Sequence, residues 1–174
     1  MSYARLWLSF YTNPSTFVQG LAEQRGPPKG LLASLQRALM DSLLLYLPIS
    51  LMGFVPPERS YLSYIPTANY YTALIGLAPV ILIAEWLLAG AAMHLILRLS
   101  GRKSDIDLVL NISGFGALAI GSVLLVWDWA WILAGRLNQY WLGASHLLID
   151  VWESLYRRSA SGRSWMFRSG WASW

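Results

Sequence analysis

The sequence contains no cysteine, only two histidines and few charged residues, which make up 13% of its 174 residues. Without cysteine there is no disulfide framework, thiolate metal site or thiol nucleophile. A Walker loop, a dinucleotide-binding fingerprint, a nucleophile elbow and a His-Glu-x-x-His pattern are also missing. We therefore expect no enzymatic activity and no cofactor.

The apolar composition instead indicates a lipid environment. Apolar residues make up 56% of the chain, which leaves too little polar surface to cover a globule in water. Ten tryptophans and nine tyrosines suit the headgroup level of a bilayer, where membrane proteins concentrate aromatic rings. We predict an all-α fold, a polytopic transmembrane helical bundle of about four spans, with the lipid bilayer and no nucleic acid as its partner.

Three apolar runs predict three of the spans, each long enough to cross the hydrocarbon core as a helix: residues 30–55, 71–97 and 106–127. Pro48 is expected to kink the first of them. Residues 1–30 form an amphipathic arm at the membrane interface, where Asn13 can cap a helix that begins at Pro14. Ser104 and Asp107 resemble a capping box at the start of the third span.

The fourth span is expected within residues 139–156, where polar residues recur every three or four positions. Such a helix can cross the membrane with its polar stripe facing the bundle, or it can lie in the interface. A crossing puts ten of the thirteen basic residues on one side, taken as cytoplasmic, with Arg37 inside the first span near that side, and leaves only Arg59 and Arg136 opposite. We therefore predict a multi-pass membrane location, the cell membrane in a prokaryote, with both termini cytoplasmic.

This interpretation divides the chain into three parts. Residues 1–30 are the interfacial arm, and residues 31–156 are the transmembrane domain. Residues 157–174 change abruptly to arginine, serine, glycine and tryptophan, and we expect a basic tail that is disordered or cut short.

Four stretches follow one another in an order that resembles the Yip family of Rab-interacting polytopic membrane proteins, in a prokaryotic-type form. They are Asn13-Pro14-x-x-Phe17 and the runs 91–101 (AAMHLILRLSG), 111–116 (NISGFG) and 143–152 (GASHLLIDVW). For eukaryotic members the resemblance implies vesicle traffic and prenylated small GTPases as partners. Only the polytopic architecture is carried over to this chain, in which we expect the last of the family's usual spans to be missing.

Several polar residues inside the spans are candidates for chemistry. Arg37 and Asp41 lie one helical turn apart and can neutralise each other. Glu85 lies near mid-span, where a carboxylate should be protonated, paired or facing a cavity, and His94 falls on the opposite face of the same helix. Each of these residues suits either a transport pathway or an isolated packing contact.

His146 and Asp150 lie one turn apart in the last segment. That spacing suits two ligands of one metal ion, or a carboxylate that orients an imidazole. A metal site needs three or more convergent ligands, so we expect a structural hydrogen bond and no metal.

One side of the third span carries small residues at three- and four-residue spacing, around Asn111. Gly114, Ala117 and Gly121 on this side would let another helix approach closely. We predict that this face packs against a neighbouring span.

Two classes of function remain. The first is a non-enzymatic membrane protein that organises the bilayer, acts in trafficking or binds a membrane-protein partner or a second copy through its helices. Its basic loop would contact anionic lipid headgroups through Arg98, Arg102 and Lys103. The second is a small transporter, channel or intramembrane enzyme with a polar cavity built from Glu85, His94, Asn111, His146 and Asp150. Convergence of these side chains would favour the second class, and separate interhelical hydrogen bonds the first.

Overall fold

The computed structural model describes residues 1–23, 28–56, 64–135, 141–149 and 151, and within these all regular structure is helical. The elements are α1 (Tyr3–Thr12), α2 (Pro14–Glu23), α3 (Pro28–Asp41), the π-helical η1 (Ser42–Tyr46), α4 (Leu47–Leu51), the 3-10 helix η2 (Thr67–Asn69), α5 (Tyr70–Leu99) and α6 (Ile106–Leu133). Residues 141–149 are also helical. The predicted all-α fold class is therefore present.

Two helices are long and apolar enough to cross a membrane. They cover Thr67–Leu99 and Ile106–Leu133, with mean hydropathies of 2.1 and 2.0. Only 11% of the most apolar window is buried in the first, against 44% in the second. Thus α6 is the central helix of the bundle and α5 lies at its outside. The predicted spans 71–97 and 106–127 fall within these two helices, but α6 continues six residues beyond the expected end.

The first predicted span, residues 30–55, is not one long α-helix. It consists of α3, η1 and α4 in succession, and Pro48 is the second residue of α4, directly after the π-helical turn ends at Tyr46. Proline has no N–H, so the carbonyl of Leu44 receives no α-helical hydrogen bond from position 48. The indole Nε1–H of Trp129 on α6 donates to this carbonyl at 2.8 Å. A side chain from a neighbouring helix therefore completes the backbone at the proline.

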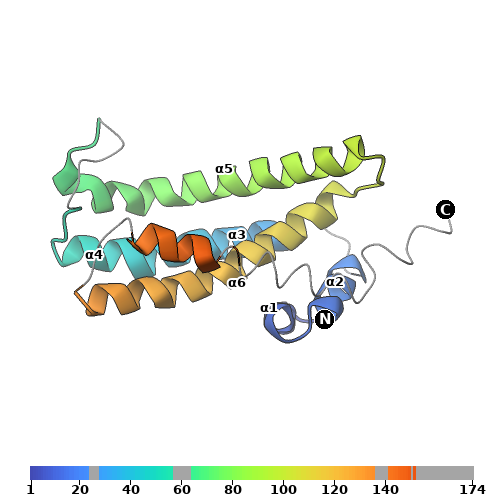
Figure 1. Ribbon diagram of the computed structural model, residues 1–174, viewed down its shortest axis with the longest axis horizontal. Helices are drawn as coiled ribbons and strands as arrows, with labels where there is room; N and C mark the ends of the chain where they lie inside the picture. The colour runs from blue at the N-terminus through green and yellow to red at the C-terminus, as the bar shows by residue number, and fades with distance from the viewer. Residues whose placement is uncertain (24–27, 57–63, 136–140, 150, 152–174) are drawn as a thin grey trace.

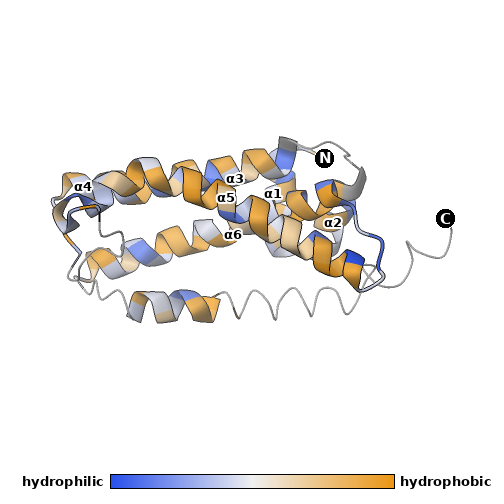
Figure 2. Ribbon diagram, turned by 90° about the horizontal axis from the view of Figure 1, so that it is seen from above, coloured by the Kyte–Doolittle hydropathy of each residue, from blue (hydrophilic) through white to orange (hydrophobic). Residues whose placement is uncertain are grey.

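Helices α3, α4, α5 and α6 lie along the long axis of the molecule. Figure 1 shows α3 with α4, α5 and α6 side by side, and contacts join each pair among α3, α5 and α6. The segment 141–149 lies beside the second half of α6 and bonds to it through two side chains. In Figure 2 apolar residues colour most of the length of α5 and α6.

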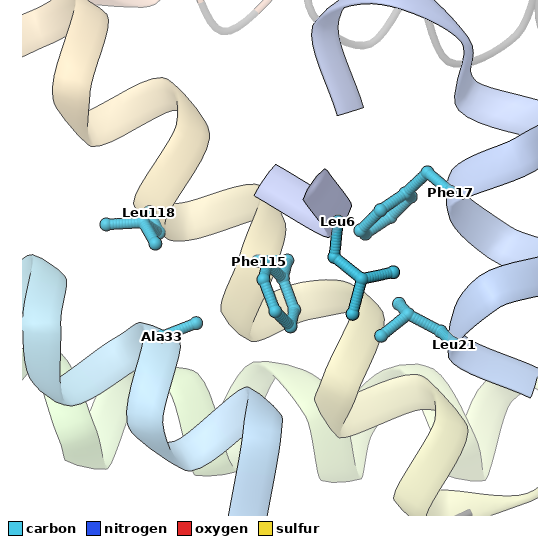
Figure 3. Close-up of a cluster of buried hydrophobic side chains, with 6 residues drawn as sticks. All are labelled: Leu6, Phe17, Leu21, Ala33, Phe115 and Leu118. Atoms are coloured by element: carbon cyan, nitrogen blue, oxygen red, sulfur yellow. The ribbon is translucent and has the colours of Figure 1, made fainter. Parts of the chain in front are cut away.

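The N-terminal arm packs against the first half of α6. Six buried side chains meet there, from α1, α2, α3 and α6 (Figure 3): Leu6, Phe17, Leu21, Ala33, Phe115 and Leu118. The phenol of Tyr11 donates to the Ala119 carbonyl at 2.6 Å, and burial raises the pKa of this phenol. As predicted, Asn13 caps the helix that begins at Pro14, accepting from the Thr16 amide at 3.3 Å.

Candidate functional site: a buried polar cluster between α3, α6 and residues 141–149

An ion pair lies at the end of α3. Arg37 and Asp41 are four residues apart, and the guanidinium bonds the carboxylate, as the spacing predicts. The same Nη1 donates to the carbonyl of Gly121 on α6 at 2.9 Å. Both side chains are largely buried, so the pair also joins two helices. In an apolar surrounding, an arginine needs this mutual neutralisation to be tolerated.

A second polar contact joins α6 to the segment 141–149. His146 Nε2 lies 2.6 Å from Asp128 Oδ1, and the Trp127 indole donates to Ser145 Oγ at 2.9 Å. Asp128 is buried at 7% exposure. We expected Asp150 to be the partner of His146, but Asp150 lies outside the described residues. The contact to Asp128 was not expected, because that residue was placed beyond the end of the third span.

The two contacts belong to one polar cluster, which consists of Arg37, Asp41, Asp128 and His146. Asp128 and His146 lie close enough to Asp41 for their charges to act on it. Ser42, which follows Asp41 in the chain, is buried at the start of the π-helical turn, and its Oγ has no hydrogen-bond partner among the described residues. When the His146 imidazole is neutral, the cluster contains one positive charge, on Arg37, and two carboxylates, those of Asp41 and Asp128. Protonation of His146 would bring the net charge of the cluster to zero.

The described side chains of the cluster are not grouped as a metal site. In the part of the chain that the structure describes, no group of three or more His, Asp, Glu or Cys side chains could hold a metal ion. What these residues can do is hydrogen bond, neutralise one another and exchange a proton, because imidazole and carboxyl groups both titrate.

The small-residue face of α6 meets α3. A Cβ on Gly114 would lie 2.8 Å from the Gly30 carbonyl carbon, and one on Gly30 would lie 2.6 Å from the Leu110 carbonyl oxygen. Asn111 Oδ1 accepts the Gly30 N–H at 2.6 Å and so satisfies an amide that the first turn of α3 leaves free. This close approach agrees with the predicted packing face.

The other two small residues of this face have different surroundings. A Cβ on Gly121 would overlap the Arg37 side chain rather than a backbone, so this glycine makes room for the guanidinium. Ala117 is half-buried between the two glycines. One sequence pattern therefore serves a backbone contact at Gly114 and a charged contact at Gly121.

Two candidates lie away from the cluster. Glu85 is exposed near the middle of α5. His94 Nδ1 lies 2.9 Å from Ser104 Oγ, at the turn between α5 and α6. We expected Ser104 to cap α6, and this prediction is wrong. Asp105 has that role, and its carboxylate accepts from the amides of Asp107 and Leu108.

The basic loop lies at the same turn. Arg98, Arg102 and Lys103 are exposed around the end of α5 and before the start of α6. Figure 1 places this turn at the same end of the bundle as α1 and α2.

Sequence reasoning missed Asp128 and Ser42. Asp128 directly follows the apolar run 106–127, so the sequence places it after the end of the predicted third span and not inside a helix. A serine at the start of a leucine run carries no distinct signal, since its hydroxyl can bond its own helix. The useful clue in the sequence would have been that Trp129–Leu133, the residues after Asp128, are all apolar, which predicts that the helix continues past the aspartate.

No family model matches the chain, and neither the curated proteins nor the solved structures compared with it contain a match.

Proposed function

We propose that the chain is a multi-pass integral membrane protein that works without enzymatic chemistry, organising the membrane or binding partners through its helices. The reversed burial pattern of α3 carries this proposal. Its buried residues are small or polar: Ala33, Ser34, Ala38 and Asp41. Its exposed residues are leucines: Leu31, Leu32, Leu35 and Leu39. A helix in a water-soluble protein shows the opposite arrangement.

The two long helices also expose large apolar side chains, and α6 buries polar ones. Asn111 and Asp128 are buried in α6, whereas Val126 and Leu133 are 71% and 79% exposed. On α5, Leu88 is 71% exposed. Soluble monomers rarely expose apolar surface on this scale, because burial of such side chains in water-free surroundings is the main driving force of folding. Lipid tails supply those surroundings for a bundle whose outside is leucine and valine.

The proposed topology has four crossings, made by α3 with α4, by α5, by α6 and by the span predicted within residues 139–156, of which the structure describes the helical part 141–149. The arm and the basic loop share one end of the bundle (Figure 1), which fits a cytoplasmic side rich in arginine and lysine. Arg98, Arg102 and Lys103 would contact anionic headgroups there, each contributing about 1 kcal/mol. In a prokaryote the membrane would be the cell membrane.

The separation of the candidate polar residues supports a non-enzymatic role. Asn111 completes the first turn of α3, His94 bonds to a loop serine, and Glu85 lies on the outside of α5. Asn111 and His94 therefore make separate contacts, and Glu85 lies apart from both. The resemblance to the Yip family favours the same class of function, with partners held by helices rather than by a catalytic pocket.

The polar cluster favours one alternative, a small proton-linked transporter or channel. Asp41, Asp128 and His146 come from α3, α6 and the segment 141–149 and meet in the interior of the bundle. Ionisable residues inside transmembrane bundles often mark proton pathways. An intramembrane enzyme is less well supported, since the hydrogen-bonded histidine and serine, His94 and Ser104, lie at the turn between α5 and α6 and not in the interior of the bundle.

Membrane insertion and topology can be tested in intact cells. The protein should stay with the membrane after alkaline extraction and leave it only with detergent. Single cysteines at Ser2, Tyr64 and Ser100 should react with an impermeant reagent only at Tyr64. A cysteine at Ser169, outside the described residues, reports on the fourth crossing and should not react. Release by alkali would contradict membrane insertion, and labelling at Ser169 would leave three crossings.

Reconstituted vesicles distinguish the two classes of function. With a pH gradient and a pH-sensitive dye inside, the protein should carry no proton flux above that of protein-free vesicles. A flux that the Asp128→Asn variant abolishes would replace the proposed role with transport through the polar cluster.

A further inference from the structure

The N-terminal arm meets α6 well away from the basic loop. The ring centroids of Tyr3 and Phe115 are 5.1 Å apart, and the Tyr11 phenol donates to the Ala119 carbonyl. Phe115 and Ala119 follow Ile106, the first residue of α6, by nine and 13 positions. At a rise of about 1.5 Å per residue, these contacts lie about 14 and 20 Å along α6 from the basic loop. Figure 1 shows α1 nearly end-on beside α6, so α1 crosses the bundle at this level.

A flat bilayer surface at the basic loop does not suit the arm. One headgroup layer is about 5 to 8 Å thick, so the arm would lie inside the hydrocarbon. The exposed side of the arm is largely polar: Arg5, Leu8, Thr12, Asn13, Thr16 and Gln19. In hydrocarbon its hydroxyl, amide and guanidinium groups would lose their hydration. The arm therefore needs headgroups and water at its own level.

A flat bilayer surface at the level of the arm does not suit α5. The last turns of α5 lie between that level and the basic loop, and four of their large apolar side chains are at least half exposed: Met93, Leu95, Ile96 and Leu99. A surface at the arm would leave these side chains in water, where apolar exposure on this scale is unfavourable. The end of α5 therefore needs acyl chains nearer to the basic loop than the arm allows.

We propose that the cytoplasmic surface of the bilayer dips on one side of α6, so that phospholipid headgroups reach the exposed side of the arm while acyl chains still cover the end of α5. Figure 1 shows α5 and the arm on opposite sides of α6, so one bundle can meet both levels. The dip is about 10 Å deep, which is the level of the arm less one headgroup layer. Arg5 suits the phosphate groups that the dip brings to it.

A dip of this kind thins one leaflet beside the bundle. The hydrocarbon barrier is shorter there, and the lipids around the protein are tilted or compressed to follow the surface. This gives the proposed organisation of the membrane a physical form, and the inference rests on the proposed membrane insertion.

Spin labels on single cysteines can measure the dip, because the natural chain has no cysteine. In vesicles of phosphatidylcholine and phosphatidylglycerol, collisions of each label with a water-soluble nickel chelate are compared with collisions with oxygen, which concentrates in acyl chains. Thr12→Cys reports on the arm. Leu88→Cys is the matched control, since this exposed residue of α5 lies about 16 Å from the end of the helix. The nickel-to-oxygen ratio should be at least fivefold higher at Thr12.

A label at Ala92 distinguishes a dip from a flat surface at the level of the arm. Ala92 is exposed on α5 about 10 Å from its end, nearer to the basic loop than the arm is. Its ratio should be within about twofold of that at Leu88. A ratio at Ala92 as high as at Thr12 would contradict the dip.

Removal of polar groups from the arm tests what holds the dip. The double variant Arg5→Leu, Thr16→Leu should lower the ratio at the Thr12 label at least threefold. The control Arg98→Leu, Ser100→Leu also removes one arginine and one hydroxyl, both exposed beside the basic loop, and should leave that ratio within about twofold. An unchanged ratio in the arm variant would contradict the role of its polar side.

The same labels separate a failure of the dip from a failure of membrane insertion. A low ratio at Thr12, Leu88 and Ala92 alike would leave insertion standing and overturn the dip. A high ratio at all three would show that α5 is not in the bilayer, which would overturn the proposed membrane insertion as well.

Discussion

The two halves of α6 hold their neighbours by different means. The first half meets α3 through small residues at Gly114 and packs on the N-terminal arm through Phe115 and Leu118. The second half makes polar contacts, to Arg37 through the Gly121 carbonyl and to His146 through Asp128. In lipid, where apolar contact alone gives little preference for one neighbour, close backbone packing and hydrogen bonds are the two available sources of specificity. One helix uses both.

The largest effect is expected in the polar half. Asp41→Leu leaves the Arg37 charge buried without its carboxylate, which should lower the free energy of unfolding by about 3 to 5 kcal/mol. Unfolding in mixed detergent micelles, followed by circular dichroism, measures the loss. The double variant Arg37→Met, Asp41→Leu removes both charges and should recover most of it. A single variant as stable as the double one would show that the pair is not buried in apolar surroundings.

The variant Gly114→Leu tests the close packing of the first half of α6 against α3. The new side chain would meet the Gly30 backbone, which cannot rotate away as a side chain can, so we expect a loss of about 3 kcal/mol. Gly76→Leu is the control, since a Cβ there has nothing within 4 Å. Thermal unfolding in detergent compares the two variants. Equal midpoints would mean that α3 does not approach α6 at Gly114.

The contact between α6 and the segment 141–149 should be weaker. Asp128→Leu leaves His146 without its carboxylate partner, and we expect a cost of about 1 to 3 kcal/mol. His146→Gln retains a hydrogen bond to Asp128 and should cost less. The labelling rate of a cysteine at Leu142 reports whether the segment separates from α6. Slow labelling in Asp128→Leu, as in the parent, would show that other contacts hold it.

The smallest effect concerns the bond to the Leu44 carbonyl. Trp129→Phe keeps a ring but removes the N–H, and the expected loss is about 1 kcal/mol. Trp131→Phe provides a control for the change in ring size at a half-buried site on the same helix. Thermal unfolding of the two variants measures the difference, and a larger loss in the control would argue against a role for the Trp129 bond.

The sequence predicted the features that depend on local spacing. Hydropathy located the two long helices, and the four-residue separation of Arg37 and Asp41 predicted their ion pair. The three- and four-residue spacing around Gly114 predicted a close helix contact. Each of these follows from the geometry of a single helix, in which residues three or four apart share a face.

The contacts that sequence reasoning missed are between helices. Asp128 and His146 are 18 residues apart on different helical segments, so no periodicity connects them. The same holds for Ser104, whose capping pattern looked favourable but whose hydroxyl bonds to His94 across a turn. Such pairs depend on the relative rotation of helices, which packing of the entire bundle determines.

The bond between Trp129 and the Leu44 carbonyl makes the order of mutations matter during evolution. A lineage that loses Trp129 while Pro48 remains leaves that carbonyl without its donor, whereas Pro48→Ala restores a backbone N–H that can take over. Loss of the proline therefore opens a nearly neutral route to loss of the tryptophan, and the reverse order passes through a less stable intermediate. We expect homologous chains that lack the tryptophan to lack the proline as well.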